Sequence, residues 1–146
     1  MVRMSTQTSS DSVIRYTVVG ICTVIVFVLP YGYHVDLGPG PNGLMAILWE
    51  YPEGVGFLPL SALEYFIYYL YRIVVLRAVW RFMSDKMTAS RMMTHAVLAE
   101  LIPVFISIPG ALFLNAEGEN YIPIMIPIPV LLLFCIVLLA FRRTHR

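Results

Sequence analysis

The chain has 146 residues, of which 59% are hydrophobic and only 13% are charged. Soluble domains carry about 25% charged residues, so this composition argues against a soluble globular domain. The formal net charge is only +1, and the bases are scattered over short segments rather than clustered, which excludes nucleic acid as an expected partner.

The N-terminal part of the chain predicts a polar tail followed by a first membrane helix. Residues 1–15 are rich in Ser and Thr and are expected to form a cytoplasmic tail. The apolar run that follows predicts a membrane helix over residues 16–33. Residues 30–34 do not form a small-x-small cleavage site, which favours a retained helix over a cleaved signal peptide.

The next segment, residues 34–57, is predicted to be a long external loop. It opens with a Gly- and Pro-rich run at residues 38–43, which indicates successive turns. Apolar side chains then recur with the helical spacing i, i+3, i+4 and i+7, at Leu44, Ile47, Leu48 and Tyr51. This spacing predicts a short amphipathic helix over residues 44–51, lying on the outer surface of the protein.

Three further apolar stretches predict membrane helices over residues 58–79, 92–114 and 122–141. The segments between and after them are predicted as a cytoplasmic connector, an external turn and a basic cytoplasmic tail, over residues 80–91, 115–121 and 142–146.

The last of these stretches opens with Pro123, Pro127 and Pro129. One proline suits the first turn of a helix, but three at this spacing predict a broken or extended start. Regular helix is therefore expected only from about residue 129. Irregular backbone at membrane depth must be covered by protein or line a wet cavity, so the segment is expected to pack against a neighbour from this chain or another.

The charges are segregated along the chain. Nine of the ten Lys and Arg residues fall in segments predicted to face one side, and the segments predicted to face the other side carry acids without bases. Cytoplasmic loops retain Lys and Arg. We therefore expect an all-α integral membrane bundle of four helices, with both termini in the cytoplasm and a multi-pass location in the plasma membrane. Its expected surroundings are the lipid bilayer and, at the cytoplasmic face, anionic lipid headgroups.

Three ionisable residues fall inside the predicted spans, namely Glu64, Arg72 and Glu100. Each costs about 2.5–3.5 kcal/mol at the centre of a bilayer, so each needs a partner. Arg72 and Glu100 come at nearly equal depth on adjacent antiparallel helices, which predicts an ion pair. Tyr68 and Ser107 share the helix faces of these residues and complete a predicted polar seam.

The polar seam allows two interpretations. Ionisable residues inside a membrane commonly mark an ion or proton path or a polar-ligand site. The alternative is structural, with a buried pair that fixes how the helices pack. Two acids facing one base leave one acid in excess, which a purely structural pair would not need.

The remaining reactive side chains give no sign of a cofactor or a metal, and none is expected. Cys22 and Cys135 are isolated and read as small buried hydrophobes. His95 stands alone among apolar residues near a predicted helix end. His34 has acids nearby in the same loop, but without the dedicated spacing of a cation site.

No catalytic motif is visible, and we expect a protein that is not an enzyme. H-E-x-x-H, G-x-S-x-G, Walker A and G-x-G-x-x-G are all absent from the sequence. The expected function is helix packing, as an accessory subunit of a membrane complex with a protein partner or as a homo-oligomer. The alternatives are a small oligomeric transporter or channel using the polar seam and, with less support, an enzyme acting on lipid.

Overall fold

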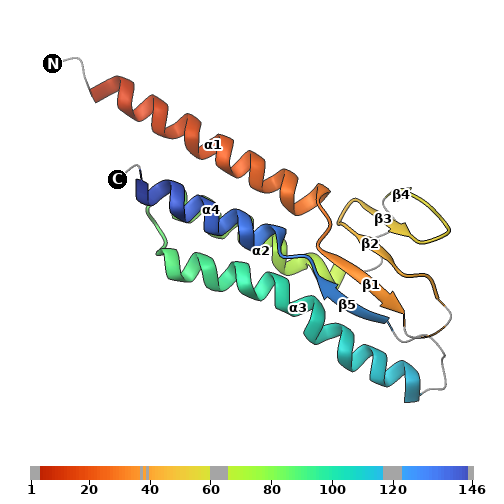
Figure 1. Ribbon diagram of the computed structural model, residues 1–146. Coiled ribbons are helices and arrows are strands. Elements are labelled where there is room, and N and C mark those ends of the chain that lie inside the picture. Colours follow the sequence, from red (N-terminus) through yellow and green to blue (C-terminus); the bar gives the residue numbers. More distant parts are fainter. Residues whose placement is uncertain (1–3, 37, 39, 60–65, 117–122, 145–146) are drawn as a thin grey trace.

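The computed structural model describes residues 4–36, 38, 40–59, 66–116 and 123–144. The architecture is mixed α/β, with helices running side by side and a five-stranded antiparallel sheet at one end of them (Figure 1). The first helix begins and the last helix ends at the end of the molecule away from the sheet (Figure 1).

Helices make up most of the described chain. They are α1 (Met4–Val28), α2 (Phe66–Met83), α3 (Ala89–Ala116) and α4 (Val130–Thr144). Helix α3 packs against both α2 and α4, and α1 packs against α2 and α4. Ala78 of α2 and Ala96 and Ala99 of α3 are buried in the core.

The strands are short and come mainly from the segment between α1 and α2. They are β1 (Gly32–Asp36), β2 (Gly43–Met45), β3 (Trp49–Pro52), β4 (Leu58–Pro59) and β5 (Pro123–Pro127). The strand order is β4-β3-β2-β1-β5, and every neighbouring pair is antiparallel. Strand β5 therefore brings the chain before α4 back beside β1, with Val35 opposite Ile124.

One hydrophobic core joins the helices to the sheet. Its fully buried members include Cys22 and Val26 of α1, Val75 of α2 and Leu131 of α4. Met125 of β5 belongs to the same core, and β5 is the strand that packs against α3. The two cysteines are buried and free, as the sequence indicated.

The expected all-α, multi-pass membrane bundle is wrong. A five-stranded sheet occupies the predicted loop and the ends of predicted spans. Among the described residues one helix, over Ala89–Phe113, has the length and apolar composition that a membrane span needs. Helix α4 has 15 residues, or about 22 Å at 1.5 Å per residue, against a hydrocarbon core of about 30 Å. Helix α2 holds three arginines among its 18 residues.

The apolar runs have the length of membrane spans, but they are not helical throughout. The predicted helix over residues 16–33 ends at Val28, and the chain then enters β1. The predicted helix over residues 58–79 begins with β4, and α2 is described from Phe66 onward. The predicted multi-pass location in the plasma membrane depended on the four-helix bundle, and it is wrong as well.

The predicted surface helix over residues 44–51 is also wrong. Its residues form β2, a tight turn and β3, with Leu44 opposite Tyr51 and Met45 opposite Glu50. A short apolar run fits the helix period and the strand period about equally well. The pairing between β2 and β3 determines that these residues form strands.

The extended start expected before the last helix is confirmed. Pro123 and Pro127 bound strand β5, and α4 begins only at Val130. The neighbour that covers this segment is β1 of the same chain.

Candidate functional site

The predicted ion pair between Arg72 and Glu100 is confirmed. Nη1 of Arg72 on α2 lies 3.0 Å from Oε2 of Glu100 on α3. The side chains are 0% and 5% exposed, so the pair is closed to solvent. A buried pair of this kind must satisfy its remaining polar atoms to offset the cost of desolvation.

Glu100 also makes a hydrogen bond at the start of α4. Its Oε1 accepts a hydrogen bond of 3.3 Å from the backbone N–H of Leu132. The first N–H groups of a helix have no partner within it, and Pro129, just before α4, has no capping side chain. The carboxylate therefore joins three helices: it pairs with α2, belongs to α3 and caps α4.

Arg72 also lies against aromatic rings. Its guanidinium carbon is 5.9 Å from the ring centroid of Tyr31, within the range of a cation–π contact. The Tyr31 ring in turn lies 6.1 Å from that of Tyr69. Within the described part of the chain, Nε and Nη2 of Arg72 have no hydrogen-bond partner.

Ser107, another member of the predicted polar seam, makes its hydrogen bonds with residues other than Arg72 and Glu100. Ser107 is buried, but its hydroxyl donates to the carbonyl of Val104 and accepts from the N–H of Met125. It thus fastens β5 to α3 instead of facing Arg72. The side chain of Tyr68 and the whole of Glu64 lie outside the described residues.

The turn between α2 and α3 forms a second polar centre, which the sequence did not reveal. Helix α2 ends in a Schellman motif: the N–H of Lys86 bonds to the carbonyl of Arg81, and that of Asp85 bonds to Phe82. Asp85 takes the left-handed position of this motif, with φ of 55°. Glycine is the usual residue there, so the side chain of Asp85 needs another reason to be present.

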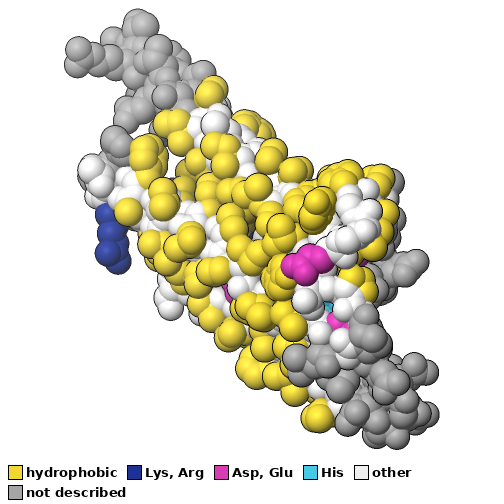
Figure 2. All heavy atoms as spheres, turned by 45° about the vertical axis from the view of Figure 1, so that its right-hand side comes forward, with side chains coloured by type: hydrophobic (Ala, Val, Ile, Leu, Met, Phe, Trp, Pro, Cys, Tyr) yellow, Lys and Arg dark blue, Asp and Glu magenta, His cyan; other side chains and the backbone are white. Residues whose placement is uncertain are grey.

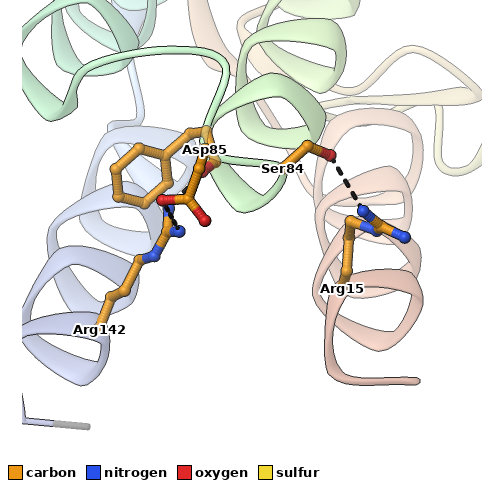
Figure 3. Close-up of polar contacts among 5 residues, drawn as sticks. Arg15, Ser84, Asp85 and Arg142 are labelled. Atoms are coloured by element: carbon orange, nitrogen blue, oxygen red, sulfur yellow. Dashed lines mark hydrogen bonds and ion pairs between the residues drawn. The ribbon is translucent and has the colours of Figure 1, made fainter. Parts of the chain in front are cut away.

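That reason is Arg142 near the end of α4, as Figure 3 shows. Its Nη2 lies 2.6 Å from Oδ1 of Asp85, and its Nη1 donates to the carbonyl of Phe82. On the other side of the turn, Nη1 of Arg15 on α1 donates to Ser84 over 3.3 Å (Figure 3). The turn between α2 and α3 is therefore bonded to α1 through Arg15 and to α4 through Arg142.

Two acids of the segment around His34, Asp36 and Glu53, make local hydrogen bonds. The Asp36 carboxylate accepts from the N–H groups of Gly38 and Gly40, and Glu53 accepts from the hydroxyl of Tyr33. Burial lowers the pKa of His34, while Asp36 and Glu50 act in the opposite direction. Over the described residues no group of three His, Cys, Asp or Glu side chains is arranged to hold a metal ion.

Comparison of the chain with known protein families, with curated proteins and with solved structures finds no match.

Proposed function

We propose that the protein acts by helix packing, without catalysis, as an accessory subunit of a larger complex at a membrane or as a homo-oligomer. The observation that carries this proposal is the apolar surface left uncovered on the helices. Helices α3 and α4 each carry an exposed apolar stripe in addition to the face that they bury in the core.

The stripe on α4 follows the helical spacing i, i+4, i+8, at Leu133, Val137 and Phe141, with Val137 66% exposed. On α3 a similar stripe runs through Leu101, Phe105, Ile108 and Leu112. The side chains of Phe105 and Leu112 are 66% and 67% exposed. Each of these helices therefore has an apolar face that stays exposed, in addition to the apolar face that packs in the core.

Apolar side chains also gather on the surface of the molecule. Figure 2 shows them covering much of the face in view, with few charged side chains among them. Soluble monomers rarely expose large contiguous apolar patches, and such patches mark contacts with another protein or with a membrane. Another chain, with lipid around it, would remove this surface from water.

The transport alternative has less support. An ion or proton path needs its ionisable groups to reach water, whereas Arg72 is fully buried and Glu100 nearly so. Both oxygens of Glu100 are already bonded, one to Arg72 and one to Leu132. These contacts favour a pair that holds the helices in place.

The mass of the protein particle purified in mild detergent tests the proposal. We expect a mass above the 16.6 kDa of one chain. The double variant Leu133→Ser/Val137→Ser should fall to a single chain, because its stripe no longer packs. The control Val55→Ser/Phe57→Ser removes apolar side chains of similar exposure near the sheet and should keep the full mass. Wild-type protein at the mass of one chain would overturn the proposal.

A further inference from the structure

Two pockets flank the turn between α2 and α3, and they differ in charge. One, of about 350 Å³, is lined by Arg142 and Arg143, but also by Asp85, which already pairs with Arg142. The other, of about 220 Å³, is lined by Arg77, Arg81 and His95, together with Val74, Ala78 and Met87. The described residues in the wall of this second pocket include no acid.

The two arginines of the second pocket stand on one face of α2. Arg77 and Arg81 are four residues apart, so their side chains leave the helix on the same side. Both residues are exposed, and neither makes an ion pair with any residue that the structure describes. They differ in this from Arg72 and Arg142, which each have a carboxylate partner.

His95 enters the pocket from α3 and is oriented by Tyr71. The hydroxyl of Tyr71 lies 2.7 Å from Nδ1 of His95, and the two rings are 5.9 Å apart. The tautomer of the imidazole decides the direction of this hydrogen bond, and Tyr71 donates to Nδ1 in the tautomer that carries its proton on Nε2. The pocket is therefore lined by two guanidinium groups and by an imidazole that presents a donor in this tautomer.

We propose that this pocket between α2 and α3 binds a phosphate group. Guanidinium groups bind phosphate through paired, charge-assisted hydrogen bonds, and two of them are already on the same helix face. Pockets for drug-sized ligands measure about 300–1,000 Å³, so a cavity of about 220 Å³ suits a smaller group. A lipid headgroup and a free phosphate ion share this chemistry.

The inference deepens the proposed function, because a bound headgroup would hold the packing subunit at an anionic lipid surface. The two proposals can fail separately. Particle mass reports on packing of the apolar stripes, whereas phosphate binding reports on Arg77, Arg81 and His95.

Binding by the full chain in non-ionic detergent tests the pocket. Inorganic phosphate is titrated in a calorimeter, and binding to phosphatidylcholine vesicles is measured with and without phosphatidic acid. The variant Arg77→Gln/Arg81→Gln should bind at least about tenfold more weakly than wild type, since both charge-assisted contacts are lost. The control Lys86→Gln/Arg143→Gln removes the same charge outside the pocket and should bind as wild type does.

A comparison of the two ligands distinguishes a site for free phosphate from a site for a lipid headgroup. Binding of inorganic phosphate that depends on Arg77 and Arg81 supports the pocket with a free ion as ligand. Binding confined to vesicles that contain phosphatidic acid, with the same dependence, supports a lipid headgroup. Equal losses in the two double variants would show attraction to the general surface charge and overturn the proposal, as would a wild-type protein that binds neither ligand.

Discussion

Glu100 is a buried acid that contacts two helices besides its own. Its carboxylate is held by Arg72 and by the first turn of α4, so one side chain links α2, α3 and α4. Breaking a buried pair leaves the other charge without compensation, while replacing both partners by apolar residues is commonly neutral.

We predict that Glu100→Gln lowers the free energy of unfolding by about 3–5 kcal/mol, because Arg72 then stays buried without its counter-ion. The double variant Arg72→Met/Glu100→Leu should recover much of this loss. Unfolding in urea with the protein in mild detergent measures both. A Glu100→Gln variant as stable as wild type would show that the pair does not hold the fold.

Gly43 is required by a close approach of two strands. A Cβ atom built there would lie 2.6 Å from the carbonyl oxygen of Tyr51 and 2.7 Å from Cα of Pro52. Both of these are backbone atoms of β3, which cannot move aside without breaking the pairing.

We predict that Gly43→Ala destabilises the protein by about 1–3 kcal/mol, the usual cost of overpacking. Gly110→Ala is the matched control, since nothing lies within 4 Å of its added Cβ in α3. That control should be neutral or stabilising by roughly 0.5–1 kcal/mol. Thermal unfolding compares the two, and equal midpoints would contradict the packing at Gly43.

Stability at acid pH should depend on His34. Because burial lowers the pKa of this imidazole, the unfolded chain takes up the proton first as the pH falls. The contribution is fully present above the unfolded pKa of about 6.5 and is lost as the pH falls towards the folded pKa. We expect His34→Gln to remove this part of the slope of unfolding free energy against pH. An unchanged slope would assign the effect to other groups.

At the scale of elements, local signals were sufficient for some segments and insufficient for others. The prolines before α4 predict an extended start because proline acts on its own backbone. That β5 pairs with β1 is a contact across almost ninety residues, which no local pattern contains. The capping of α4 by Glu100 is also a contact between residues far apart in the sequence, so no local pattern predicts it.

The hairpin of β2 and β3 shows how a periodicity can mislead. Leu44, Ile47, Leu48 and Tyr51 follow helical spacing, yet Gly43 and Pro52 stand opposite each other at the open end of a hairpin. Both residues lie outside residues 44–51, so they suit the ends of a helix as well as the ends of a hairpin, and the local pattern could not distinguish the two.

We predict that backbone chemical shifts of Leu44, Met45, Glu50 and Tyr51 are those of strands. Nuclear magnetic resonance of isotope-labelled protein in detergent measures the Cα and Cβ shifts. Helical values across residues 44–51 would restore the surface helix and contradict the hairpin.

At the scale of the whole molecule, the charge segregation seen in the sequence has a structural counterpart. The arginines at positions 15 and 142 meet the turn between α2 and α3, while Asp36, Glu50 and Glu53 lie in or beside the sheet. The sequence predicted this separation and the Arg72–Glu100 pair. The number of membrane spans could not be derived from it, because charge patterns do not show where a helix ends.

Strand β5 pairs with β1 at the edge of the sheet and so brings the two halves of the chain together. Disulfide formation in the variant Val35→Cys/Ile124→Cys, made in a background of Cys22→Ser and Cys135→Ser, tests this pairing. Paired residues in antiparallel strands have Cα atoms about 4.5–5.5 Å apart, within the range of a disulfide. We predict rapid oxidation for this pair and none for Val35→Cys/Met125→Cys, because adjacent residues of a strand point to opposite faces. Equal oxidation of both pairs, or of neither, would contradict the fold.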